Sequence, residues 1–175
     1  MLRRPTRISI LILTLPLVAG ASLAAPPPLP ADAPPLDRLN AEMKKIRGQL
    51  RNASVKMKNG IKGLGGKTGE DTSVMKSCCG SNLGHIARAA LAIDGLLPDL
   101  AGCYESENND MASAAVEFYR NDLRAFARAM ALLQDAQGPH DAKMFMDGTT
   151  RAFLQLRESG DELPACPRAG ESPAE

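Results

Sequence analysis

Apolar residues recur at steps of three and four along most of this 175-residue chain. Such steps place side chains on one side of an α-helix, which turns once every ~3.6 residues. Alanine, leucine and methionine are abundant in the same segments and are good helix formers, whereas valine, isoleucine, tyrosine and phenylalanine are too sparse to indicate a sheet. The pattern predicts amphipathic helices at 36–57, 72–97, 110–137 and 140–158.

Each predicted helix carries one apolar line that can be buried only against the other helices. In chain order these lines are Leu36, Leu39, Met43, Ile46, Leu50, Ala53 and Met57; Met75, Cys79, Asn82 or Leu83, Ile86, Ala90, Ile93 and Leu97; Val116, Tyr119, Leu123, Phe126, Met130 and Leu133; and Ala142, Phe145, Thr149, Phe153 and Leu156. Short connections between such helices predict an all-α fold, an antiparallel up-down-up-down four-helix bundle.

Helix-breaking and capping residues mark the expected helix ends. Asn59-Gly60 should end the first helix. Pro98 should end the second, because the residue before a proline is pushed out of helical geometry. Asn109 or Asp110 should cap the third helix with its side-chain oxygen.

The first 24 residues have the features of a secretory signal peptide. Three arginines precede an apolar run, Ile8–Val18, and the small residues of Ala21-Ser22-Leu23-Ala24 follow it. The run is about half as long as a membrane-spanning helix. We therefore expect residues 1–24 to be removed, the protein to be periplasmic or secreted, and no stable membrane insertion after cleavage; a retained anchor is the alternative.

Cleavage would leave 151 residues, enough for one domain with a core. Residues 25–35 (APPPLPADAPP) predict an extended proline-rich spacer, with a ligand for a proline-binding groove as the alternative. We assign 36–167 to the bundle domain and 168–175 to a disordered tail. The signal holds three of the 21 basic residues and none of the 20 acidic ones, so the mature chain carries a net charge of −2. This charge does not favour nucleic acid as a partner.

The cysteines are Cys78, Cys79, Cys103 and Cys166, which can form two disulfides in three ways. In an alternating bundle the second and fourth helices end at the same pole, which places Cys103 near Cys166. Cys78 and Cys79 begin the second helix roughly 27 Å away, beyond the reach of a disulfide. We predict a Cys103–Cys166 disulfide that stabilises the fold by about 2–4 kcal/mol.

Cys78 and Cys79 are left unassigned. Neighbouring helical side chains point about 100° apart, so a disulfide between these two would require local unwinding. They are interpreted as one buried thiol and one spare, or as members of a long-range pair. A redox or metal site with His85 is the alternative, although His85 is six residues beyond Cys79 and is therefore misaligned with it.

Three stretches are similar to the cytochrome b562 family. Leu39-x-x-x-Met43 followed by Leu50 resembles its first helix, Ala87–Pro98 its alanine-rich second helix, and 149–155 (TTRAFLQ) its last. The resemblance implies a periplasmic four-helix bundle that holds one non-covalent haem between a methionine of the first helix and a histidine of the last. The glycine-rich loop and the four cysteines depart from the family pattern.

The resemblance covers most of the chain from Leu36 to Glu158 and places Met43 at the family's haem ligand. Leu154 stands where the haem-ligating histidine would be, and leucine has no donor atom for iron. His140 lies roughly 20 Å away along the helix and cannot substitute for that histidine. The chain is therefore interpreted as a member or relative of the family that lacks this ligand, with haem b binding as the alternative.

Residues for catalysis are scarce. The chain has two histidines, and neither H-E-x-x-H nor G-x-S-x-G occurs. Gly66-Lys67-Thr68 lacks the glycine spacing of a phosphate-binding loop. We predict that the protein is not an enzyme.

A copper carrier was the other metal hypothesis, because thioethers bind soft copper and the chain has eight methionines, including Met144-x-Met146. Four of the seven that follow the initiator lie on the apolar lines, so no metal site is predicted. The expected function is a binding or structural role in the cell envelope. Its partner is an unknown envelope protein or a second copy of the chain.

Overall fold

The computed structural model describes residue 30 and residues 33–63 and 74–166. The predicted signal peptide, most of the spacer, the loop 64–73 and the tail 168–175 lie outside these residues. Nothing in the structure therefore bears on those parts of the domain assignment.

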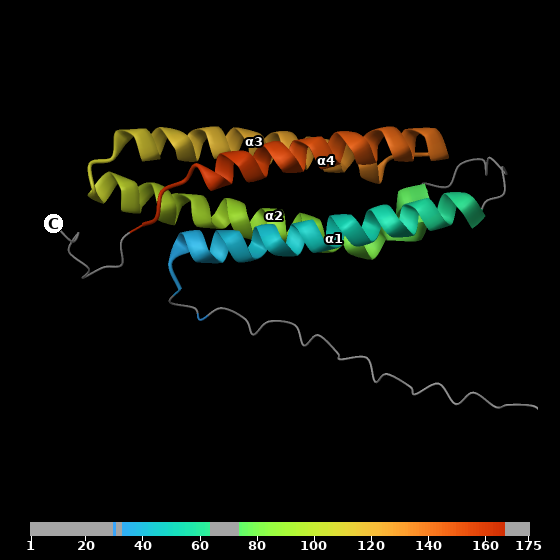
Figure 1. Ribbon diagram of the computed structural model, residues 1–175, viewed down its shortest axis with the longest axis horizontal. Coiled ribbons are helices and arrows are strands. Elements are labelled where there is room, and N and C mark those ends of the chain that lie inside the picture. Colours follow the sequence, from blue (N-terminus) through green and yellow to red (C-terminus); the bar gives the residue numbers. More distant parts are fainter. Residues whose placement is uncertain (1–29, 31–32, 64–73, 167–175) are drawn as a thin grey trace, which may run out of the picture.

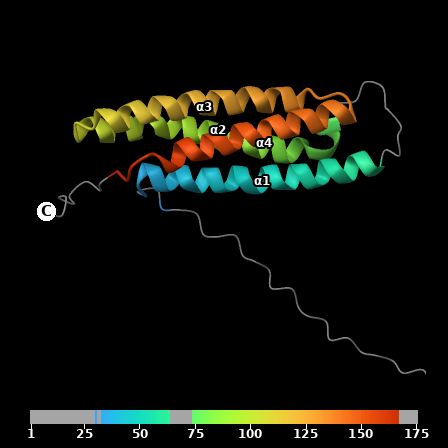
Figure 2. The ribbon, with the colours of Figure 1, turned by 45° about the horizontal axis from the view of Figure 1, so that its top comes forward.

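Four helices account for nearly all of the described chain: α1 (Pro35–Gly63), α2 (Val74–Ser106), α3 (Asp110–Gln134) and α4 (Pro139–Asp161). No strand occurs within the described ranges, so the all-α prediction is confirmed. The helices lie side by side in two layers, with α1 and α2 below α3 and α4 in Figure 1. The turned view of Figure 2 places α4 between α3 and α1.

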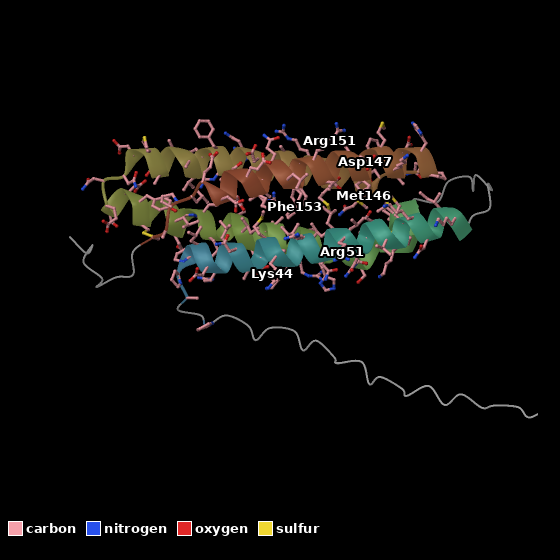
Figure 3. All side chains as sticks on the ribbon, viewed as in Figure 1. Lys44, Arg51, Met146, Asp147, Arg151 and Phe153 are labelled. Carbon is pink, nitrogen blue, oxygen red and sulfur yellow. A yellow bond between two sulfur atoms is a disulfide. The ribbon has the colours of Figure 1, made fainter. Side chains whose placement is uncertain are left out.

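The predicted apolar lines form the core. Nearly all of their residues are buried, and both Asn82 and Leu83 are buried where the sequence left a choice. Leu36, Ala90 and Phe145 are only partly buried. Met146 takes an inward position on α4 beside Phe153, and Figure 3 labels both residues. Buried leucine, isoleucine and aromatic side chains supply the main force that holds the helices together.

The predicted end of α1 at Asn59-Gly60 is wrong, since the helix continues to Gly63. Ile61 is partly buried against the core, and this burial favours one further turn. A Cβ atom at Gly60 would lie 3.5 Å from the Cβ of Cys78. That distance is an ordinary van der Waals contact, so the position lies where α1 meets α2 without requiring glycine.

The predicted end of α2 at Pro98 is also wrong, because the helix runs through this proline to Ser106. Proline lacks the N–H that would bond the carbonyl four residues earlier, at Asp94. Asp94 and Pro98 are both exposed, so water can reach that carbonyl. Leu100 and Tyr104, which follow the proline, are buried, and their packing keeps the chain helical.

The remaining helix ends lie near their predicted positions. The side chain of Asn109 caps α3 by accepting a hydrogen bond from the backbone N–H of Ala112 at 3.0 Å, as one of the two predicted caps. Helix α3 ends at Gln134, three residues before the predicted end, and α4 begins one residue earlier than predicted, at Pro139. Proline is favoured in the first turn, where its missing N–H is not needed.

Candidate functional site

Cys103 and Cys166 lie together at one end of the molecule. Cys103 is in the last turn of α2 and Cys166 follows α4; their Cα atoms are 6.4 Å apart and their sulfur atoms are joined as a disulfide. The hydroxyl of Tyr104 donates to the carbonyl of Pro164 at 2.7 Å and ties the same two segments together. This placement is the one that the predicted pairing requires.

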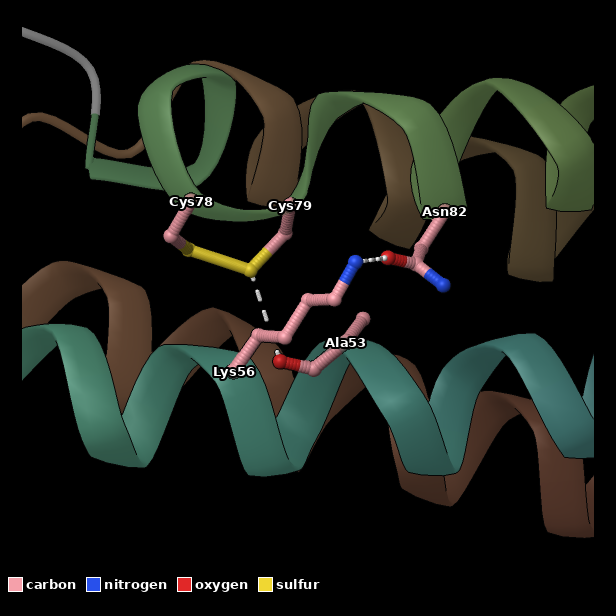
Figure 4. Close-up of a disulfide and its surroundings, with 5 residues drawn as sticks. All are labelled: Ala53, Lys56, Cys78, Cys79 and Asn82. Carbon is pink, nitrogen blue, oxygen red and sulfur yellow. Dashed lines mark hydrogen bonds between the residues drawn. A yellow bond between two sulfur atoms is a disulfide. The ribbon is translucent and has the colours of Figure 1, made fainter.

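Cys78 and Cys79 are paired with each other inside α2 (Figure 4). The helix continues through both residues, so the unwinding expected for such a pair does not occur in the structure. Their Cα atoms are 3.8 Å apart, the spacing of neighbouring residues across a trans peptide. Both side chains turn toward α1, which brings the sulfur atoms together despite the helical twist.

The buried Cys79 faces the backbone of α1. Its sulfur lies 3.4 Å from the carbonyl oxygen of Ala53. As part of the disulfide, the sulfur of Cys79 has no hydrogen and only contacts this oxygen. As a reduced thiol, Cys79 could donate a hydrogen bond to it. His85 is not brought to these cysteines: it is exposed, and its Nδ1 lies 2.9 Å from Arg88 NH2. The structure thus does not assemble the redox or metal site considered with His85.

Polar side chains cross the boundary between α1 and α2 beside the cysteines. Lys56 Nζ donates to Asn82 Oδ1 at 2.9 Å, and Asn82 Nδ2 donates to Gln49 Oε1 at 2.7 Å. Asn82 is only 6% exposed, and these two hydrogen bonds satisfy both the oxygen and the nitrogen of its buried amide. Such a pairing favours one alignment of α1 against α2, because a shift would leave the amide without partners.

A cavity of about 240 Å³ adjoins this polar chain. It is lined by Glu42, Lys45, Gln49, His85, Arg88 and Ala89. Lys45 pairs with Glu42 at 2.5 Å, and Arg88 contacts His85. The lining holds no serine, threonine or cysteine, so it does not supply a hydroxyl or thiol nucleophile.

The positions that the cytochrome resemblance would give to haem ligands do not form a haem site. Met43 is buried within the α1 core line, at 8% exposure. Leu154 is 41% exposed and faces away from the core, whereas its neighbour Phe153 points inward. His140, at the start of α4, is exposed. The residues present therefore do not fit a haem held between α1 and α4.

The Met144-x-Met146 pair is split between two environments. Met144 is 48% exposed and Met146 is buried, because residues two apart in a helix point in different directions. Within the described ranges, no three or more histidine, cysteine, aspartate or glutamate side chains are grouped closely enough to hold a metal ion. In the same ranges no helix combines the length and apolar character needed to cross a membrane.

Exposed apolar side chains form a line along α3 that the sequence analysis missed. Met111 is 85% exposed, Phe118 69% and Leu132 55%, and Ala125 between them is also exposed. These four residues, called here the α3 apolar line, follow one another at intervals of seven. The seven-residue spacing is visible in the sequence, but the sequence analysis considered only the core line of this helix, which does not include Met111, Phe118 or Leu132.

Comparison with known proteins yields no relative for this chain. No family model, no curated protein and no solved structure matches it. The similarity to the cytochrome b562 family therefore stays a resemblance of helix pattern, carried by the three stretches named above.

Proposed function

We propose that this chain is a non-catalytic helical-bundle protein of the cell envelope that acts by binding, and that its contact surface is the α3 apolar line. In this proposal the signal at residues 1–24 directs export, and the mature protein is periplasmic or secreted. The helices form an up-down-up-down bundle whose pole is closed by Cys103 and Cys166. The exposed apolar residues of α3 are the observation that carries the proposal.

The arrangement of these residues distinguishes them from scattered surface apolar groups. Seven residues are nearly two full turns, so side chains at this interval drift by only about 20° per step along the helix. From Met111 to Leu132 the line is about 32 Å long at ~1.5 Å per residue. Single exposed apolar residues are common, but several of them aligned on one side of a helix favour an interaction site.

A second copy of the same chain fits this surface. In an antiparallel pair of α3 helices, Phe118 of each copy lies opposite Ala125 of the other copy. Each large ring therefore meets a small side chain. Met111 then lies opposite Leu132. The same arrangement brings Glu117 near Arg124 of the other copy on both sides of the symmetry axis, which is a favourable pairing of opposite charges.

Sedimentation equilibrium over a range of protein concentrations tests this contact. We expect a weak, concentration-dependent dimer, because one helix face is a small interface. Phe118→Glu should weaken dimerisation by at least about tenfold, since it places a charge against an apolar partner. Leu154→Glu is the control, because Leu154 is an exposed leucine outside the line. A strictly monomeric wild type, or equal loss in both variants, would contradict the proposal.

Absorption and intact mass of the exported protein, purified without reductant, test whether it carries haem or a metal ion. We expect a colourless protein whose chain begins at Ala25. Its mass should be lower than that of the fully reduced chain by two or four hydrogens, for one or two disulfides. A Soret band, or an excess mass equal to a metal ion, would overturn the proposal in favour of a haem or metal carrier. Met43 would then be the first residue to replace.

A further inference from the structure

Basic side chains follow one another along a single face of α1. The helix contains eight lysines and arginines and only two acidic residues. Five of the basic residues, called here the α1 basic line, are Lys44, Arg47, Arg51, Lys58 and Lys62. Their intervals of three, four, seven and four residues keep them within one narrow sector of the helix surface. All five are exposed, and Figure 3 labels Lys44 and Arg51.

The residues of this line have no acidic partner among the residues that the structure describes. In the described part of the chain, the ion pairs are Lys45–Glu42 and Arg120–Glu117, and neither includes a residue of the line. The second acid of α1, Asp37, is in the first turn, where the helix dipole favours a negative charge. The line thus presents about 27 Å of positive charge from end to end at ~1.5 Å per residue.

A helix face that only needs to be solvated usually alternates positive and negative residues, which stabilises it. Here Lys44 and Arg47, Arg47 and Arg51, and Lys58 and Lys62 are like charges at spacings of three or four. Such pairs destabilise a helix. Because the mature chain has a net charge of −2, the rest of the molecule is acidic and the positive charge is concentrated on α1.

The surroundings of the line narrow the choice of partner. Protein partners are usually anchored by aromatic residues and arginines packed into desolvated pockets, and single-stranded nucleic acid is bound on aromatic platforms. Helix α1 has no aromatic residue, and its one large exposed apolar residue is Val55. Its apolar face is buried in the core, so it cannot enter a bilayer as an amphipathic helix would. Binding to a flat anionic surface requires only positive charge. Because α1 is straight, all five residues of the α1 basic line can contact such a surface at once.

We propose that the α1 basic line holds the protein against the surface of an anionic phospholipid bilayer. Binding is electrostatic and peripheral, with the lysine and arginine side chains among the headgroup phosphates and no apolar insertion. It is therefore reversed by salt, because the attraction falls off within a Debye length. The contact uses α1 alone and does not depend on pairing of the α3 apolar lines.

Co-sedimentation of the whole mature protein with vesicles tests this surface. The vesicles contain phosphatidylcholine alone or phosphatidylcholine mixed with phosphatidylglycerol, at low and high salt. Arg47→Glu combined with Lys58→Glu reverses two charges on the line. Arg128→Glu combined with Arg151→Glu is the matched control, because it makes the same change in net charge at exposed positions of α3 and α4.

We expect the wild type to bind only the phosphatidylglycerol vesicles, and only at low salt. The α1 variant should bind at least about 25-fold more weakly, since each basic residue contributes about fivefold. It should also melt no lower than the wild type, because each new glutamate has a lysine or arginine three or four residues away. The control should retain most of the wild-type binding.

Three outcomes would overturn the proposal. The wild type could fail to bind anionic vesicles at low salt, or could bind neutral vesicles equally well. The control could lose as much binding as the α1 variant, in which case net charge alone governs the interaction. The Phe118→Glu protein should bind the vesicles as the wild type does even when it no longer dimerises, because the membrane contact uses α1 alone.

Discussion

At the scale of single residues, two buried tyrosines differ in how their hydroxyls are satisfied. Tyr104 donates to the carbonyl of Pro164, whereas the hydroxyl of Tyr119 is buried without a partner among the described residues. The Tyr119 ring packs on the backbone of α4 at Gly160, where a Cβ atom would lie 3.1 Å from Tyr119 Cε2. Any larger residue at this position would press on the ring, so the glycine permits the close approach.

Removing the unsatisfied hydroxyl should stabilise the protein. We expect Tyr119→Phe to raise the free energy of unfolding in urea by about 1 kcal/mol, because an unpaired buried polar group is costly. The matched variant Tyr104→Phe should lower it by about 1 kcal/mol through loss of the bond to Pro164. Destabilisation by Tyr119→Phe would mean that the hydroxyl has a partner, such as a buried water molecule.

The same tyrosines predict a loss of stability at alkaline pH. Burial raises the pKa of both side chains above the ordinary value of 10.0. Below pH 10 both folded and unfolded states keep the phenolic protons, so these groups do not change stability there. As the pH rises above 10 toward the folded-state pKa, the unfolded chain loses protons first and is favoured.

Urea unfolding in steps from about pH 8 to about pH 11 checks this dependence. Tyr119→Phe should reduce the alkaline loss of stability but not abolish it, because Tyr104 still titrates. An identical alkaline loss in the variant and the wild type would exclude Tyr119 as a contributor.

At the scale of elements, α2 is held helical against its own sequence. Pro98 costs a helix interior roughly 3 kcal/mol relative to alanine, while its rigidity restricts the unfolded chain and returns up to about 1 kcal/mol. We therefore expect Pro98→Ala to raise the free energy of unfolding by about 2 kcal/mol, measured by urea denaturation. The side chain is exposed, so no core contact is lost. A decrease would show that the proline stabilises the native backbone in a way that alanine cannot.

At the scale of the whole molecule, the contact between Cys103 and Cys166 joins segments 63 residues apart. A disulfide that closes a loop of this length restricts the unfolded chain strongly. We expect Cys103→Ser with Cys166→Ser to lower the free energy of unfolding by about 2–4 kcal/mol. Denaturation with intact-mass analysis of the same samples measures both the stability and the bonding.

The vicinal cysteines provide the control for that experiment. Cys78 and Cys79 are adjacent, so a bond between them closes no chain loop and restricts the unfolded state little. Cys78→Ala with Cys79→Ala should therefore cost less than loss of the long-range pair. An equal or larger cost would show that burial of Cys79 outweighs the constraint on the chain.

The sequence by itself determined the helical class and most of the core, because helix periodicity and burial are local properties of a segment. Leu39, Ile46, Phe126 and Leu133 are buried as their spacing predicts. The cap of α3 at Asn109 was also visible, since a side chain and the N–H groups three residues later make it. The basic residues of α1 are equally plain in the sequence, but their use as a surface depends on which face the core leaves outside.

Only the tertiary structure decided where the helices end and which apolar residues stay exposed. Gly60 and Pro98 are local helix breakers, yet packing of Ile61 and Tyr104 on other helices outweighs them. Phe118 lies off the core line of α3, and only the arrangement of the helices shows that no other described element covers it. The physical reason is that burial against distant segments contributes about 1.5–3 kcal/mol per side chain. Several such side chains together outweigh the cost of a helix-breaking residue, which is about 1 kcal/mol for glycine and about 3 kcal/mol for proline.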